Sequence, residues 1–232
     1  MKIYTNETKI KRFKKFGNYT TFGSVAILGL GLYISIAHPA QLAWAYVALI
    51  LGFMLSQIGM FLSSKYGRSP RPDEIISTAL KGLDNKYGLF HHYTGVPHLL
   101  IGPAGVWTFI IFGQGGTITY DENKKRWKQK GGNLYMKIFG QENLGRPDNE
   151  VRINRENFED YWKKYFKDTP QPELKTALVF TSERVSVNAP NAPYPTITVD
   201  KLKDVIRREM KENPLSNEDC ETIKSLITNT IQ

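Results

Sequence analysis

The feature that most constrains this chain is a long uncharged stretch near its beginning. Residues 16–64 contain no Asp, Glu, Lys or Arg. This is about twice the ~20 residues that a helix needs to cross a bilayer once. Residues 38–41, which include a proline, divide the stretch into two halves that are apolar on all sides, which argues against amphipathic surface helices. The pattern therefore predicts a hairpin of two transmembrane helices over residues 19–63.

Cations flank this stretch, and most of the chain's formal charge of +9 lies in the short segment before it. The cations expected at the membrane interface are Lys9, Lys11, Arg12, Lys14, Lys15, Lys65 and Arg68. Because positive flanks stay in the cytoplasm, both termini and the main domain are expected there, which makes the chain a two-span protein of the cell membrane. Residues 1–18 are expected to be a basic cytoplasmic arm at an anionic leaflet, a better-placed partner than nucleic acid.

Two alternative interpretations of the apolar segment fit less well. A secretory signal peptide would place its Ala-Trp-Ala cleavage pattern, residues 43–45, inside the second apolar run. A buried hairpin in a soluble protein would need a larger domain than the remaining residues provide. Transport is also a poor fit, because neither predicted helix carries an ionisable residue. An anchor with two spans is the prediction that remains.

Small residues recur every four positions on both predicted helices. They are Ala48, Gly52 and Ser56 on the second and Gly31 and Ser35 on the first. This spacing lets two helix backbones approach closely. Small residues are also common in membrane helices generally, so the sequence is compatible with both close packing and ordinary composition.

Beyond a proline-rich linker at residues 64–72, the pattern changes to that of an α/β domain with a mixed central sheet flanked by helices. A helical period over 73–83 is followed by short apolar strands at 98–101 and 106–112. Further helices, expected at 149–166 and 201–211, and further strands extend the domain to residue 212, and residues 213–232 are expected to form a separate C-terminal helix.

Titratable residues offer little chemistry in this domain. The single cysteine, Cys220, excludes an internal disulfide and a cysteine-rich zinc site, and acidic neighbours disfavour its thiolate. His91, His92 and His98 suggest a metal site, but a loop pair and a hydrogen-bonded strand histidine explain them better. No metal and no cofactor are expected.

Several phrases in order resemble the nuclease-related domain (NERD) family. They are an early helix with Glu74, the run His98-Leu99-Leu100-Ile101-Gly102-Pro103-x-Gly105-Val106, a glycine-rich turn before Thr117-Ile118-Thr119, Trp127, and Ile197-Thr198-Val199-Asp200-x-Leu202. The resemblance covers residues 73–212 and implies a restriction-endonuclease-like PD-(D/E)xK fold. It also implies Mg²⁺-dependent nuclease chemistry, with an aspartate before the position of His98 and a glutamate and lysine on the next strand.

The residues at those positions depart from the catalytic pattern. Pro97 stands at the aspartate position, and Ile110 and Phe112 stand at the glutamate and lysine positions. These side chains cannot hold a hard divalent cation. Glu74 remains as a weak catalytic candidate, and one carboxylate is insufficient for a magnesium site. We therefore expect a domain without nuclease activity.

A run of cations around one tryptophan is the clearest remaining functional signal. Its residues are Lys124, Lys125, Arg126, Trp127, Lys128 and Lys130. The cations could bind a phosphate backbone while the ring stacks on a base. Alternatively, the run is a solvated hairpin whose tryptophan packs on the sheet, or a surface that lies against anionic lipid.

Three functional hypotheses follow from the sequence. The first is a membrane-anchored protein whose cytoplasmic NERD-like domain is a binding or interaction module without catalysis. The second is a membrane-tethered nuclease with a rearranged site that uses Glu74 with Asp121, Asp148 or Glu150. The third is a lipid-surface or assembly protein that does not bind nucleic acid.

Overall fold

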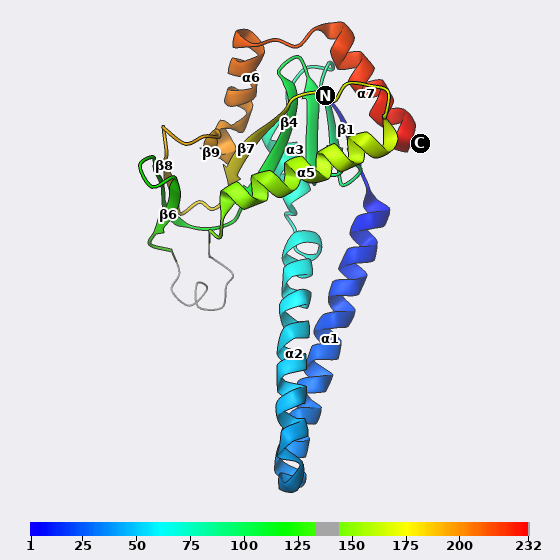
Figure 1. Cartoon of the computed structure of the whole chain (residues 1–232), viewed down its shortest axis with the longest axis vertical. Helices are drawn as coiled ribbons and strands as arrows, with labels where there is room; N and C mark the ends of the chain where they lie inside the picture. Colours follow the sequence, from blue (N-terminus) through cyan, green and yellow to red (C-terminus); the bar gives the residue numbers. More distant parts are fainter. Residues whose placement is uncertain (133–143, 232) are drawn as a thin grey trace. The chain divides into compact units, whose positions relative to one another are not determined.

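The computed structural model describes residues 1–132 and 144–231 (Figure 1). The chain divides into two compact units. One unit, here called the hairpin, comprises Asn6–Glu74. The other, here called the domain, comprises Met1–Thr5 together with Ile75–Gln232.

Two long helices make up most of the hairpin. Helix α1 spans Glu7–Ala37 and α2 spans Leu42–Leu62, joined by the 3₁₀ turn η1, Pro39–Gln41, and followed by the π-turn η2, Ser63–Gly67. Asn6 caps α1 by accepting a hydrogen bond from the Lys9 amide at 2.9 Å. Both apolar helices are long and apolar enough to cross a membrane, by length and composition. Only 11% and 22% of their most apolar windows are buried, unlike the mostly buried core helix of a soluble protein.

Small residues line the seam between α1 and α2, at a spacing of seven residues. The buried positions include Gly17, Ser24 and Gly31 on α1 and Ala45, Gly52 and Gly59 on α2. A seven-residue repeat is typical of two helices that wrap around each other with a left-handed twist. Gly31 and Gly52 of the sequence prediction lie in this seam, and Ala48 lies against Gly31, but the observed period is seven and not four.

The open end of the hairpin is held by an aromatic contact and by ion pairs. Phe13 of α1 stacks on Tyr66 of η2, with ring centroids 5.1 Å apart. The Arg71 guanidinium lies 2.9 Å from the buried Asp73 carboxylate and 3.4 Å from Glu7. Its hydrogen bond to Asp73 raises the pKa of Arg71 above its ordinary value. These contacts join the start of α1 to the residues that follow α2.

A mixed six-stranded sheet forms the centre of the domain, in the order β1-β2-β3-β4-β7-β9. The strands are β1 (Lys2–Thr5), β2 (Gly88–His91), β3 (His98–Gly102), β4 (Gly105–Phe112), β7 (Leu174–Phe180) and β9 (Thr196–Thr198). Strands β2, β3 and β4 form an antiparallel meander, while β1, β7 and β9 pair parallel to their neighbours. The glycine at the β3–β4 turn, Gly105, has a positive φ of 98°, which favours glycine there.

Helices cover both faces of this sheet and make a three-layer α/β/α domain (Figure 1). The helices are α3 (Pro72–Ala79), α5 (Pro147–Tyr165), α6 (Leu202–Glu212, after the 3₁₀ turn η3, Val199–Lys201) and α7 (Asn217–Ile231). Helices α3 and α6 pack on one face of the sheet in a cluster around Leu100 and Phe109. Helices α5 and α7 pack on the other face, around Phe90 and Leu99. The expected α/β class with a mixed central sheet is thereby confirmed.

A second sheet of three strands lies beside the first, in the order β6-β5-β8. Strand β5 spans Gly116–Asp121, β6 spans Arg126–Lys130 and β8 spans Val185–Asn188. One face of this sheet packs on a third apolar cluster through Ile118, Trp127 and Val187. Its other face carries the exposed residues of the alternating pattern.

The ends of the chain differ most from the expected domain boundaries. The expected basic arm, residues 1–18, contains strand β1 and the first turns of α1. The expected separate helix at residues 213–232 contains α7, whose Ile223 and Ile227 are buried in the core of the domain. Both terminal segments therefore contribute elements to the domain.

Candidate functional site

Strand β4, on which the NERD resemblance implies a catalytic glutamate and lysine, ends in an apolar cluster. Ile110 and Phe112 of β4 are only 7% and 6% exposed. They pack with Leu178 and Phe180 of β7, and the rings of Phe112 and Phe180 stack with centroids 5.1 Å apart. Pro97 precedes β3, and its carbonyl accepts a hydrogen bond from the His92 amide. These residues offer a divalent cation no anionic ligand.

Glu74, the weak catalytic candidate, has a structural role in the hairpin unit. It is the third residue of α3, and its Oε2 accepts a hydrogen bond from the Arg71 amide at 2.8 Å and another from the Ser69 hydroxyl at 2.9 Å. A glutamate at this position that bonds back to the residue before the helix is one half of a capping box. This contact accounts for a glutamate at this position on structural grounds.

The other carboxylates of the rearranged-nuclease hypothesis do not form a metal site. Asp121 ends β5 and binds the Lys128 ammonium at 2.7 Å, which is the main reason that its pKa is lowered. Asp148 and Glu150 are exposed in the first turn of α5. Within residues 1–132 and 144–231, no group of three or more His, Cys, Asp or Glu could hold a metal ion.

Three histidines form a buried polar cluster at one end of the central sheet. His91 ends β2 and His98 begins β3, directly opposite each other. Their Nδ1 atoms lie 2.9 Å apart, so one ring donates the shared proton and the other accepts it. The Ser77 hydroxyl of α3 lies 2.9 Å from His91 Nε2, and the His92 ring lies edge-on to His98. The arrangement ties α3 to the sheet, and Ser77 had no signal in the sequence that singled it out.

The cationic run falls on the turn between β5 and β6 and on β6 itself. Strand alternation exposes Arg126, Lys128 and Lys130 on one face and turns Trp127 to the other. The Trp127 ring packs against the third apolar cluster and lies 4.9 Å from the Tyr120 ring. Lys124 and Lys125 are exposed in the turn. Arg126, Lys128 and Lys130 therefore share a face of the sheet, Lys124 and Lys125 lie in the turn that adjoins it, and the tryptophan belongs to the core side.

The cations expected at a membrane interface all lie in the hairpin unit. Lys9, Lys11, Arg12, Lys14 and Lys15 lie on the first turns of α1, Lys65 on η2, and Arg68 directly after it. Lys15 Nζ lies over the Tyr19 ring and Lys65 Nζ over the Phe61 ring, at 5.7 and 5.5 Å from the centroids. Lysines beside aromatic rings at the ends of apolar helices are typical of membrane interfaces.

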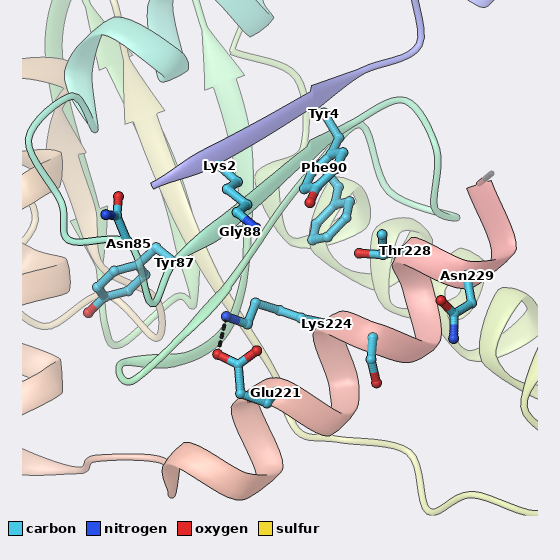
Figure 2. A pocket seen from close by; sticks show the side chains of 11 residues that line it. Lys2, Tyr4, Asn85, Tyr87, Gly88, Phe90, Glu221, Lys224, Thr228 and Asn229 are labelled. Carbon is cyan, nitrogen blue, oxygen red and sulfur yellow. Dashed lines mark hydrogen bonds and ion pairs between the residues drawn. The ribbon is translucent and has the colours of Figure 1, made fainter.

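The domain also has a hollow of about 310 Å³ at the edge of its central sheet (Figure 2). It lies between β1, β2 and α7. Tyr4 stacks on Phe90 at one side, with ring centroids 4.8 Å apart. Lys224 donates hydrogen bonds to the Glu221 carboxylate at 2.6 Å and the Lys86 carbonyl at 2.8 Å. Glu221 therefore balances the charge of Lys224. Lys2 is the other cation among the residues that line the hollow.

No family model, curated protein or solved structure matches this chain.

Proposed function

We propose that this chain is a membrane-anchored protein whose domain is a NERD-like binding or interaction module without metal-dependent nuclease activity. The observation that carries the proposal is the apolar cluster around Ile110 and Phe112, at the positions where an active enzyme of this resemblance needs a glutamate and a lysine. The order of α3, three antiparallel strands, α5 and β7 supports the fold that the resemblance implies.

The outward side chains of the hairpin support membrane anchoring. Many large apolar residues there are exposed in the protein, among them Phe22, Tyr33, Trp44, Ile50 and Phe61. Leaving so much apolar surface in water would be unfavourable by about 25 cal/mol per Å². A lipid bilayer removes this cost, because its hydrocarbon core accepts the same side chains.

The pairing of β1 supports a hairpin topology with both ends on one side. Lys2 to Thr5 pair in register with Gly88 to His91, so the residues before α1 belong to the same sheet as the residues after α2. Any bilayer that the hairpin crosses must therefore be crossed an even number of times. By the positive-inside rule, the basic flanks support a cytoplasmic location for that shared side and an outside location for the turn at residues 38–41.

Cleavage of supercoiled DNA by the full chain in detergent, with Mg²⁺ or Mn²⁺, tests the catalytic part of the proposal. We expect no cleavage above a buffer control. The matched variant is Glu74→Gln, which keeps a carbonyl oxygen for the Arg71 amide but is a poor metal ligand. Metal-dependent cleavage that Glu74→Gln abolishes would establish the rearranged nuclease instead.

Fractionation of cells tests the anchor separately. The full chain is expected in the membrane pellet after a carbonate wash, with a reporter fused at the C-terminus active in the cytoplasm. A reporter inserted in the turn at residues 38–41 is expected to be active outside. A chain that remains in the supernatant, or two reporters on the same side, would contradict the anchor topology.

A further inference from the structure

We propose that the cationic face of the β5–β6 hairpin, which comprises Lys124, Lys125, Arg126, Lys128 and Lys130, docks on the anionic leaflet of the membrane that holds the hairpin helices. This inference rests on the proposed anchoring and names the partner of the domain. The ligand chemistry is a lipid phosphate surface, recognised by charge.

Charge is distributed on one side of this small sheet. Residues two apart on a strand share a face, so Arg126, Lys128 and Lys130 line up about 6.6 Å apart. Opposite them, the register places Thr119 beside Lys128 and Thr117 beside Lys130. The register also places Asp121 beside Arg126, so the face presents a row of three cations beside two hydroxyl groups and one carboxylate.

Four of these five cations form no ion pair with a described residue, although the Asp121 carboxylate lies opposite Arg126 and accepts a hydrogen bond from the Lys124 amide. Within the described residues, Lys128 is the only one of the five that forms an ion pair, with Asp121. Lys124, Lys125, Arg126 and Lys130 make no ion pair to the part of the chain that the structure describes. Five cations against Asp121 and Glu122 leave an excess of positive charge on this segment, which fits a polyanionic surface.

The positions of the aromatic side chains on strands β5 and β6 favour lipid over single-stranded nucleic acid as the partner. Binding of single strands combines cations with exposed rings on which bases stack. Here Trp127 faces the apolar cluster, and its neighbour Tyr120 packs beside it. Within the described residues of β5 and β6, the cationic face carries charge, and both rings lie on the opposite face.

Short connections to the hairpin unit raise the local concentration of lipid. Only Asn6 separates β1 from α1, and only residues 68–71 separate η2 from α3. Both connections leave from one side of the bilayer, as argued above. A tethered surface meets its partner as an intramolecular event, so weak contacts suffice for docking.

A fluorescent label at the tip of this hairpin tests the proposal on the full chain. Asn123→Cys in a Cys220→Ser background carries an environment-sensitive dye, and the protein is placed in nanodiscs. One set contains phosphatidylcholine alone, and the other contains phosphatidylcholine and phosphatidylglycerol in equal parts. We expect protection from iodide quenching only in the second set, with the protection lost at about 1 M salt, where the Debye length is ~3 Å.

Charge removal gives the expected magnitude. Each cation near an anionic surface contributes about 1 kcal/mol, or about fivefold. The triple variant Lys124→Ala, Arg126→Ala, Lys130→Ala should therefore lower the docking equilibrium on the order of a hundredfold. The matched control is Lys163→Ala, Lys164→Ala, Lys167→Ala, at the end of α5 and beyond it, which removes the same charge and should leave docking unchanged.

Three results would overturn the inference. They are equal quenching in both lipid mixtures, equal protection in both, and protection by an added single-stranded oligonucleotide but not by phosphatidylglycerol. The last result would assign the surface to nucleic acid. None of them bears on anchoring or on the absence of cleavage, which the fractionation and DNA assays measure independently.

Discussion

The hairpin and the domain distribute their apolar side chains in opposite ways. In the hairpin, the seam between α1 and α2 holds small residues such as Gly31, Gly52 and Gly59, and the large side chains point outward. In the domain, large side chains such as Phe158 and Trp162 are buried, and the exposed face of the small sheet is cationic. Large apolar side chains therefore lie on the outside of the hairpin and in the interior of the domain.

This contrast indicates two different surroundings. In water, burial of large apolar side chains drives folding. Between two helices in lipid that driving force is absent, because lipid tails are as apolar as leucine. Close backbone approach through glycine then provides the packing. Matched substitutions in the two units can test whether this difference in surroundings is real.

The largest expected effect comes from charging two isoleucines that are both exposed in the protein. Ile50 of α2 is 61% exposed and Ile153 of α5 is 43% exposed. Ile50→Arg should reduce membrane insertion by about 2.5–3.5 kcal/mol, because an arginine near the bilayer centre is costly. Ile153→Arg should change stability by no more than about 0.5 kcal/mol, because its side chain faces water. The share of chain in a carbonate-washed membrane pellet measures the first, and thermal unfolding in detergent measures the second.

If the protein tolerated Ile50→Arg and Ile153→Arg equally, the proposed difference in surroundings between the hairpin and the domain would be wrong. If Ile50→Arg left the pellet unchanged, the outward face of α2 would not be in hydrocarbon. A loss of insertion in the Ile153→Arg variant would show that the assay reports misfolding in general. The comparison is informative because the residue, the substitution and the degree of exposure are similar at both sites.

An intermediate effect is expected from filling the seam of the hairpin. A Cβ at Gly59 would overlap Thr21 of α1, whereas a Cβ at Gly29 would meet nothing within 4 Å. Gly59→Leu should destabilise the helix pair by about 1–3 kcal/mol, the usual cost of overpacking. Gly29→Leu adds the same side chain on an open face and should be neutral. Disulfide trapping between cysteines on α1 and α2 would report the separation of the helices.

Opposite results would change the description of the seam. If Gly29→Leu separated the helices while Gly59→Leu did not, the outward face of α1 would be a contact surface in the membrane. The small residues would then reflect only the ordinary composition of membrane helices, which is the second of the two interpretations given for them in the sequence analysis.

The sequence alone was sufficient for the elements that depend on local pattern. The uncharged run predicted two helices with a break at residues 38–41, and the structure has the turn Pro39–Gln41 there. The helix expected at residues 149–166 is α5, Pro147–Tyr165, and the one expected at 201–211 is α6, Leu202–Glu212. Apolar periodicity and proline positions are encoded in neighbouring residues, so these predictions were confirmed within a few positions.

Elements that depend on partners far away in the sequence could not be predicted from local pattern. Strand β1 has four residues, and only its pairing with β2, more than eighty residues later, makes it a strand. The link between Ser77 and His91 likewise joins a helix and a strand that are separate in sequence. A segment as short as β1, or a single serine, shows no periodic pattern from which such a contact could be predicted.

The smallest predicted effect concerns an ion pair between β7 and α6 in the domain. Lys175 Nζ lies 2.6 Å from Glu209 Oε1, and this hydrogen bond is the main reason that the pKa of Glu209 is lowered from 4.5. A carboxyl whose pKa is lower in the folded state adds stability above its unfolded pKa and loses it as the pH falls through the folded pKa. Lys175→Ala should therefore destabilise the domain by about 0.5–1 kcal/mol at pH 7 and by less near pH 3.

The pH dependence separates two roles of the same lysine. Lys175 Nζ also lies 5.9 Å from the centroid of the Trp107 ring, a cation–π contact that does not depend on a carboxylate. Hydrogen exchange of the β7 amides, measured for the variant at both pH values, distinguishes these roles. A loss confined to neutral pH assigns the stabilisation to Glu209, and an equal loss at both assigns it to Trp107. Lys163→Ala, at an exposed pair with a 3.9 Å separation, is the control expected to show no change at either pH.

Because residues 16–64 carry no charged side chain, a titration of this kind has no counterpart in the apolar spans, and acid should loosen the domain while leaving the seam of the hairpin intact.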